Sequence, residues 1–266
     1  MAISNLAVVD KRAQIGVNVS IGPYAIIHGD VQIGDGCEIH AHANIMDGTI
    51  IGKDTHIFQG AIVGSVPQDL KYKGEDTKLV IGSNVSIREY CTINRGTAAS
   101  GETRINDHAL IMAYVHVAHD CVIGSHAIIA NNVNLAGHVE IDPYAVIGGM
   151  TAVQQFVSIG ESSFIGGGTL VRKDVPPYIK VAREPLSYVG INSVGLRRRG
   201  FSVDRINRIK DLYRVLFVKY KNISLALEEI DVALPESDEK VEIVQFIKSS
   251  KQGLIRGFRQ NRGNDY

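Results

Sequence analysis

The sequence lacks the features of a secreted, membrane-spanning or disulfide-stabilised protein. Its first five residues contain no basic stretch leading into an apolar segment, and no uninterrupted apolar run approaches the roughly 18 residues of a membrane span. Cysteine is scarce: Cys37, Cys91 and Cys121 are an odd number, widely spaced, and form no Cys-x-x-Cys pair. We therefore predict a cytoplasmic protein with neither a disulfide framework nor a zinc knuckle.

The chain as a whole has no net charge, because 28 basic residues balance 28 acidic ones. The two signs are nevertheless separated: residues 1–184 contain 13 Lys and Arg against 18 Asp and Glu, and residues 185–266 contain 15 against 10. Most of the positive excess falls in residues 197–221, where nine basic residues face two acidic ones. We expect this segment to attract an anionic partner. We expect neither a nucleic acid nor a membrane span to take part in its function.

A six-residue repeat dominates the first two thirds of the chain. A β-branched residue or leucine recurs at every sixth position from Ile3 to Val171, and only positions 69, 75 and 99 fail. We number the hexad from this apolar residue. Position five is small and holds all three cysteines, which indicates compact interior packing rather than reactive thiols. Position two is often glycine, which we interpret as a corner with backbone angles that favour glycine.

This pattern predicts short strands joined by abrupt turns and coiled around a narrow core, an all-β parallel β-helix. It resembles the hexapeptide-repeat left-handed β-helix family, in which three hexads form one triangular coil. The left-handed winding is implied by that resemblance and not by the repeat. We predict that residues 1–184 form this domain, with excursions near 65–80 and 98–104 where the repeat is interrupted.

The remainder of the chain has helical periodicity. Two prolines at residues 176–177 are expected to end the strand run. Ser202 is a candidate N-cap, Ser224 precedes a second apolar segment, and a third helix is expected to begin at Ser237. We therefore predict a C-terminal α-helical domain over residues 185–266.

Polar residues gather on one edge of three consecutive coils. With three hexads to a coil, residues eighteen apart stack about 4.8 Å apart. His119, His138 and Gln155 then lie on one edge, with His116 at the same corner and Asp120 beside it. If both excursions are simple insertions, they would interrupt the coil near this edge, which we call the histidine column, and form the sides of a cleft there.

The histidine column leaves three classes of function open. Imidazole titrates near neutrality, so one histidine can act as a general base. Two or three histidines at a β-helix edge can instead bind zinc, as in the gamma-class carbonic anhydrases, which share this fold. Polar residues are also tolerated at coil corners, so a non-catalytic scaffold is the third alternative.

Several motifs carry a more specific resemblance. They are Gln-Asp-Leu-Lys-Tyr at 68–72, His-Val-Ala-His-Asp-Cys at 116–121, Leu-Ala-Gly-His at 135–138 and Gly-Leu-Arg-Arg-Arg-Gly-Phe at 195–201. Together they resemble the UDP-N-acetylglucosamine O-acyltransferase family, over nearly the whole chain. The resemblance implies transfer of a 3-hydroxyacyl group from acyl carrier protein to the 3-hydroxyl of UDP-N-acetylglucosamine, the first step of lipid A biosynthesis. It also implies a homotrimer with sites between subunits, no cofactor and no metal.

The resemblance assigns roles to individual residues. His119 corresponds to the general base, Asp120 to the group that orients it, and the Gly137 backbone N–H to the oxyanion donor. Residues that would bind the sugar and diphosphate are Asp69, Lys71, His116, His138 and Gln155, and those for the nucleotide end are Asn192, Arg198 and Arg199. Gly167 corresponds to the residue that limits acyl-chain length, where glycine admits long chains.

One residue departs from the family pattern, and one related family remains an alternative. Gln154 occupies a position where the family commonly has His, which argues against an essential acid–base role there. The N-acyltransferase that acts later in the same pathway resembles this fold too. Against that alternative stands the lack of an extra N-terminal domain, because the hexads start at Ile3.

Overall fold

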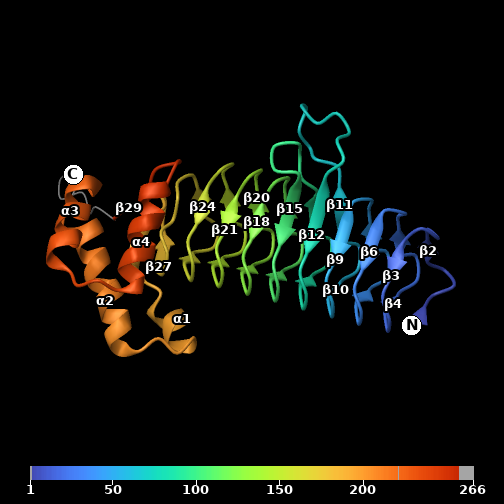
Figure 1. The fold of residues 1–266 in the computed structure, drawn as a ribbon, viewed down its shortest axis with the longest axis horizontal. Helices are drawn as coiled ribbons and strands as arrows, with labels where there is room; N and C mark the ends of the chain where they lie inside the picture. Colours follow the sequence, from blue (N-terminus) through green and yellow to red (C-terminus); the bar gives the residue numbers. More distant parts are fainter. Residues whose placement is uncertain (1, 221, 258–266) are drawn as a thin grey trace, which may run out of the picture.

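The computed structural model of the protein describes residues 2–220 and 222–257. The chain first winds into an elongated three-sided coil, and helices cover its C-terminal end (Figure 1). Each side of the coil is a parallel sheet, which we call A, B and C. From β1 to β26, consecutive strands fall on consecutive sides, so each strand pairs with the third one before and after it. This is the arrangement expected from three hexads to a coil.

The strands are mostly two residues long, one per hexad. Sheet A contains β1 (Ala2–Ile3), β4 (Ser20–Ile21), β7 (Glu38–Ile39), β10 (His56–Ile57), β13 (Ser86–Ile87), β16 (Leu110–Ile111), β19 (Ile128–Ile129), β22 (Val146–Ile147), β25 (Phe164–Ile165), β27 (Ile179–Ala182), β28 (Ser187–Ile191) and β29 (Arg256–Gly257). Sheet B contains β2 (Val8–Val9), β5 (Ile26–Ile27), β8 (Asn44–Ile45), β11 (Ile62–Ser65), β14 (Thr92–Asn94), β17 (His116–Val117), β20 (Asn134–Leu135), β23 (Ala152–Val153) and β26 (Leu170–Val171). Sheet C contains β3 (Gln14–Ile15), β6 (Val31–Ile33), β9 (Thr49–Ile51), β12 (Lys78–Ile81), β15 (Glu102–Ile105), β18 (Val122–Ile123), β21 (Glu140–Ile141) and β24 (Ser158–Ile159).

The core of the coil consists of hexad positions one and five, as the repeat predicts. Residues such as Ile93, Ile129 and Val133 are fully buried. The three cysteines are free and fully buried at position five. Burial raises the pKa of the Cys91 thiol to about 11. These cysteines are therefore interior packing residues, as expected.

The structure corrects the reason for glycine at position two. Left-handed backbone angles occur instead at position four, mostly at residues other than glycine, such as Asp120 and His138 with φ of 61° and 60°. At position two the next coil lies too close for a side chain. A Cβ on Gly52 would lie 2.5 Å from the backbone of Gly82, and one on Gly124 would lie 2.5 Å from that of Asp142. Close stacking of coils, not backbone conformation, excludes larger residues there.

Two loops interrupt the coil at one corner. Residues 66–77 connect β11 to β12, and residues 95–101 connect β14 to β15, so both leave sheet B and return on sheet C. Figure 1 shows both projecting from the same side of the coil. The turn that contains His119 connects β17 to β18 and is also a B-to-C corner. The excursions therefore lie on the side of the coil that carries the histidine column.

The C-terminal part adds helices α1 (Ser193–Arg198), α2 (Val203–Arg214), the π-helix η1 (Val215–Lys219), α3 (Ile223–Ala233) and α4 (Asp238–Ser249). Ser202 is the N-cap of α2, as predicted, Asn222 is the N-cap of α3, and Ser237 is the N-cap of α4, close to the predicted helix start. Sheet A also continues past the two prolines, because β27 pairs with β25 and then antiparallel with β28. The proposed domain division at residue 184 stays a prediction, and its end at 258–266 lies outside the described residues. No described helix is long and apolar enough to cross a membrane.

Candidate active site at the B-to-C corner

The register of sheet B places the predicted catalytic residues in two adjacent columns. Val117 pairs with Leu135, and Leu135 pairs with Val153. Position three of these coils therefore holds His119, Gly137 and Gln155. Position four holds Asp120, His138 and Phe156. The eighteen-residue spacing thus brings together side chains from three coils at a single corner.

His119 and Asp120 form a buried pair. The His119 Nδ1 atom lies 2.7 Å from the Asp120 Oδ2 atom, and the two residues are 8% and 4% exposed. Burial alone would raise the pKa of Asp120, but hydrogen bonds from Ser100, Thr97 and His119 outweigh it and lower the pKa to about 2. Asp120 is therefore ionised at neutral pH and can only accept. His119 consequently donates through Nδ1, which leaves its Nε2 with a lone pair.

The second loop holds Asp120 in place. The Thr97 backbone N–H donates to Asp120 Oδ1 at 2.8 Å, and the Thr97 hydroxyl donates to Oδ2 at 2.7 Å. The Ser100 hydroxyl also donates to this carboxylate, and the Asp120 N–H donates to the Thr103 hydroxyl at 2.8 Å. Sequence reasoning missed these three residues. The only sequence feature that pointed to these residues was the break in the hexad pattern near 98–104. It indicated a loop but not that the loop would form hydrogen bonds with Asp120.

The first loop, residues 66–77, contacts the second loop, residues 95–101. Arg95 donates to the Tyr72 hydroxyl at 2.9 Å, and its guanidinium lies 5.9 Å from the Tyr72 ring centroid. The Asp69 carboxylate accepts a hydrogen bond from the Lys71 backbone N–H at 2.9 Å, which stabilises the local turn at residues 69–71. Neither Asp69 nor Lys71 has a hydrogen bond or ion pair with the histidine column among the described residues. Their assignment to the sugar diphosphate stays a prediction.

Gly137 lies directly beneath the His119 ring. A Cβ at this position would come within 2.6 Å of His119 Cε1 and 2.8 Å of Nε2. Because His119 is buried and bound to Asp120, any side chain at 137 would displace the imidazole. The Gly137 N–H has no hydrogen-bond acceptor within the part of the chain that the structure describes, so it can donate to a ligand oxygen.

His138 and His116 complete the corner. The His138 Nε2 atom lies 3.4 Å from Asp120 Oδ2, and its ring meets the His119 ring edge-on at 5.2 Å and stacks on Phe156 at 4.7 Å. The Thr92 hydroxyl and His116 Nδ1 are hydrogen-bonded at 2.8 Å, and burial lowers the pKa of His116. Gln154 and Gln155 are both exposed at the same edge.

The residues predicted for the nucleotide end lie at a different corner. Arg199 donates to the Tyr144 carbonyl at 3.2 Å, and Tyr144 belongs to a C-to-A corner. The Arg199 Nε and Nη2 atoms are buried and have no hydrogen-bond partner among residues 2–220 and 222–257, and burial lowers the pKa of Arg199. Asn192 is a structural cap: it donates to the Ser162 carbonyl at 2.9 Å and accepts from the Gly195 N–H. Within one chain these residues are not brought to His119.

The basic segment 197–221 is partly neutralised inside the protein. Arg205 and Arg208 both pair with the buried Glu239, and Lys219 pairs with Glu229 at 2.6 Å. Arg198 is exposed and has no hydrogen bond or ion pair with a described residue. Lys221 lies outside the described residues. The segment thus presents fewer free cations than its composition indicates.

Gly167 lies at a third corner, between sheets A and B. It is exposed, and a Cβ there would lie 3.0 Å from the Gly149 carbonyl oxygen of the adjacent coil. Gly149 occupies position three of that coil, as Gly167 does of its own. The two glycines leave a stretch of coil surface free of side chains, and a side chain at 167 would require the Gly149 backbone to shift by a few tenths of an ångström.

His119, Asp120 and His138 also have the composition of a metal site, since their ligand atoms all lie within 4.8 Å of one another. Every oxygen of Asp120 is, however, already engaged by Thr97, Ser100 or His119. A metal would have to displace the hydrogen bond at 2.7 Å between His119 and Asp120. The arrangement therefore favours an oriented base over a metal centre.

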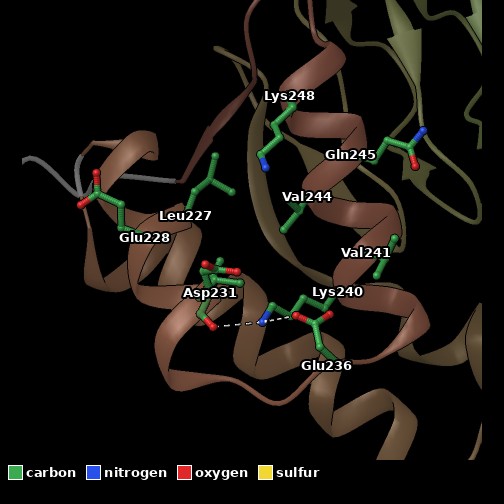
Figure 2. A pocket seen from close by; sticks show the side chains of 10 residues that line it. Leu227, Glu228, Asp231, Glu236, Lys240, Val241, Val244, Gln245 and Lys248 are labelled. Atoms are coloured by element: carbon green, nitrogen blue, oxygen red, sulfur yellow. Dashed lines mark hydrogen bonds and ion pairs between the residues drawn. The ribbon is translucent and has the colours of Figure 1, made fainter.

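A separate groove lies between α3 and α4 and has a volume of about 550 Å³. Figure 2 shows Leu227 of α3 and Val244 and Lys248 of α4 on the sides that face each other across it. Lys240 is buried there and donates to the Leu234 carbonyl at 2.9 Å. None of the residues lining this groove belongs to the predicted site.

The chain is similar to known families, to named proteins and to solved structures. The model described as bacterial transferase hexapeptide (six repeats) matches residues 12–47 and 102–137, and the model described as Udp N-acetylglucosamine O-acyltransferase, domain 2, matches residues 174–255. The acyl-carrier-protein-dependent UDP-N-acetylglucosamine O-acyltransferase of Chlorobium phaeobacteroides is 58% identical over 93% of this chain and 94% of its own. That of Sulfurihydrogenibium sp. is 55% identical over 93% and 92%.

Solved structures agree with the sequence comparison. The UDP-N-acetylglucosamine acyltransferase from Bacteroides fragilis has a TM-score of 0.94 at 46% identity, covering 95% of this chain and 99% of that one. The Arabidopsis enzyme has a TM-score of 0.85 at 35% identity, with 96% and 100% covered.

The hexad coil, its buried histidine–carboxylate corner and these matches together define an acyltransferase of the hexapeptide-repeat class. Within that class, the chain belongs to the UDP-N-acetylglucosamine O-acyltransferase family. This confirms the assignment that the sequence motifs predicted. It also favours that family over the N-acyltransferase and carbonic anhydrase alternatives.

Proposed function

We propose that this protein transfers a 3-hydroxyacyl group from acyl carrier protein to the 3-hydroxyl of UDP-N-acetylglucosamine, with His119 as general base. The single observation that carries the mechanism is the 2.7 Å contact between His119 Nδ1 and the ionised Asp120. An alcohol is a poor nucleophile until a positioned base removes its proton as it attacks. Asp120 fixes the His119 tautomer that can accept that proton at Nε2.

The chemical step then follows in two stages. The sugar 3-hydroxyl gives its proton to His119 Nε2 while its oxygen attacks the thioester carbonyl carbon, and the Gly137 N–H donates to the resulting oxyanion. The intermediate collapses, the carbon–sulfur bond breaks, and the imidazolium returns the proton to the departing thiolate. The new ester bond replaces the thioester, so no cofactor is needed and no acyl-enzyme forms.

We also propose that the active enzyme is a homotrimer of left-handed coils. Within one chain, Arg199 lies at a C-to-A corner and His119 at a B-to-C corner, so a neighbouring subunit would have to complete the site. The left-handed winding and the cytoplasmic location come from the sequence-based expectations. Size-exclusion chromatography with light scattering tests the trimer, and a monomer with full activity would contradict it.

The function is tested by incubating the full chain with UDP-N-acetylglucosamine and 3-hydroxyacyl carrier proteins of graded chain length. We expect a sugar nucleotide whose mass increases by one 3-hydroxyacyl group. Protein carrying His119→Ala is the matched control. Absence of any acylated sugar across the donor panel would contradict the proposal.

We expect Arg198→Ala and Arg199→Ala to raise the KM for UDP-N-acetylglucosamine by about tenfold, because each loses about 1.5 kcal/mol of a charged hydrogen bond to the nucleotide. The unpartnered Nε and Nη2 atoms of Arg199 support this role. The kcat should change less, and added salt should mimic part of the effect. The control is Lys210→Ala, an exposed cation on α2. A KM that is independent of salt and of both arginines would exclude this assignment.

We expect the enzyme to prefer long 3-hydroxyacyl donors, and Gly167→Met to shift its preference toward shorter ones by at least about tenfold. The added side chain would fill the bare surface beside Gly149, while sugar binding stays unchanged. Gly167→Ala introduces the same Cβ contact with little bulk and is the matched control. Equal losses on short and long donors in Gly167→Met would show that the glycine is structural.

A further inference from the structure

A second cluster of metal-ligating side chains lies on the outer face of sheet A, near the N-terminal end of the coil. It consists of Glu38, His40 and His56, whose ligand atoms all lie within 4.8 Å of one another. The cluster is on β7 and β10, whereas the candidate active site is at a B-to-C corner beyond β17. Neither the acyl-transfer mechanism nor the core uses these three residues.

The hexad register builds this cluster. Glu38 and His56 are paired neighbours across the β7–β10 ladder, and their following residues Ile39 and Ile57 point into the core. Side chains alternate along a strand, so Glu38 and His40 flank Ile39 and face outward together. Three ligands thus come from two adjacent coils. A bound ion would join these coils through side chains as well as through backbone hydrogen bonds.

The separations suit a small tetrahedral ion. Glu38 Oε2 lies 3.3 Å from His56 Nδ1 and 3.7 Å from His40 Nε2. Ligand atoms bound tetrahedrally to Zn²⁺ at about 2.1 Å are separated by roughly 3.4 Å. The carboxylate therefore already sits at the right distance from both imidazoles.

The orientation of His40 is the second observation that points to a ligand. Its ring stacks on Phe58 at 4.6 Å and 9°, and Phe58 is covered in turn by the Arg88 guanidinium at 4.3 Å. This stack turns Nε2 toward Glu38 and His56, where that atom is buried and has no hydrogen-bond partner among the described residues. The Glu38 and His56 side chains are 50% and 40% exposed, so an ion can enter from solvent.

We propose that Glu38, His40 and His56 form a binding site for a divalent transition metal of the zinc class, with a water molecule as fourth ligand. Two imidazoles and one carboxylate are ligands that such ions prefer. Binding would stabilise the folded coil, by an amount that grows with the logarithm of the free metal concentration above the dissociation constant. Metal binding requires the imidazole nitrogens to be free of protons, so acid would weaken it.

The test is calorimetric titration of the chelator-treated full chain with ZnSO4 at pH 7, together with Co²⁺ titration followed by visible absorption. We expect one equivalent of metal at this site, tetrahedral Co²⁺ bands, and a rise in Tm with Zn²⁺. His56→Gln and Glu38→Gln should each weaken this binding at least about tenfold and abolish the rise in Tm. Both replace half-exposed side chains, and circular dichroism checks that the fold is kept.

The matched control is His138→Gln, which alters the other cluster of metal-ligating residues and should leave this site unchanged. A second equivalent that is lost only in His138→Gln is compatible with the proposal, provided the first is lost in His56→Gln. Failure of the wild-type chain to bind either metal would overturn the proposal. So would binding that survives both His56→Gln and Glu38→Gln, since the ion would then be bound elsewhere.

Discussion

Replacement of His119 by alanine is expected to lower kcat by about two to four orders of magnitude. The variant removes the imidazole that the ionised Asp120 orients and that lies against Gly137. The side chain is 10% exposed but lies at the corner rather than in the coil core, so the fold should survive. The decisive measurement is single-turnover acyl transfer at saturating UDP-N-acetylglucosamine, with folding checked by circular dichroism.

His42→Ala is a suitable control, because His42 also lies at a coil corner with φ of 61° and stacks on Tyr24 at 5.0 Å. It lies at an A-to-B corner near the N-terminal end of the coil, away from Asp120 and Gly137. We expect this variant to retain near-normal turnover. If His119→Ala did so too, His119 would not be the base, and His116 or His138 would have to be considered.

Asp120→Asn should be nearly as damaging, with a loss in kcat of about two to four orders of magnitude. The asparagine amide can donate to His119 Nδ1, which stabilises the tautomer with a proton on Nε2, the atom that must accept one. The variant also weakens the contacts that hold Thr97 and Ser100, so the second loop would loosen. Both kcat and its pH profile should be measured. A wild-type profile with unchanged kcat would show that Asp120 is not the orienting group.

Two further variants separate orientation from loop anchoring. Ser100→Ala removes one hydrogen bond to Asp120 and leaves its charge in place, so kcat should fall far less than in Asp120→Asn. Asp107→Asn is the control for a corner carboxylate, because Asp107 accepts from the Ser83 N–H at 2.7 Å at another corner. A loss in Ser100→Ala equal to that in Asp120→Asn would show that loop anchoring, not the histidine tautomer, limits the rate.

The depressed pKa of Asp120 also has a consequence for stability. The pKa falls from 3.8 to about 2 in the folded protein, so the folded state binds this proton more weakly than the unfolded chain. The resulting stabilisation is fully present above about pH 4 and is lost as the pH falls toward 2. Asp120→Asn removes it at every pH, which would show as a smaller drop in Tm on acidification than in wild type.

The amino-acid sequence alone predicted which side chains meet at the candidate catalytic corner. The eighteen-residue spacing placed His119, Gly137 and Gln155 in one column, and the sheet register confirms that placement. The interruptions of the repeat located both loops at the same corner. Such features follow from periodicity, since every coil repeats the geometry of the one before it.

The reason for glycine at position two was not evident from the sequence. The repeat of glycines was clear, but we attributed it to backbone angles, whereas the structure shows that the backbone of the next coil would lie 2.5 Å from a Cβ. The recurrence of glycine at position two indicates that a residue without a side chain is needed there. This recurrence does not distinguish a conformational requirement from a steric one, because both exclude a Cβ atom.

The sequence by itself determined the class of fold, the inward and outward residues of each hexad, and the corner that carries His119, because these depend on a local repeat. Only the tertiary structure decided what surrounds that corner. Thr97 and Ser100 reach Asp120 because a non-periodic loop folds back on the coil. Arg199 lies at another corner because the C-terminal helices dock on the coil end. The spacing of the repeat does not predict where a loop that interrupts it packs, or where the chain that follows it packs.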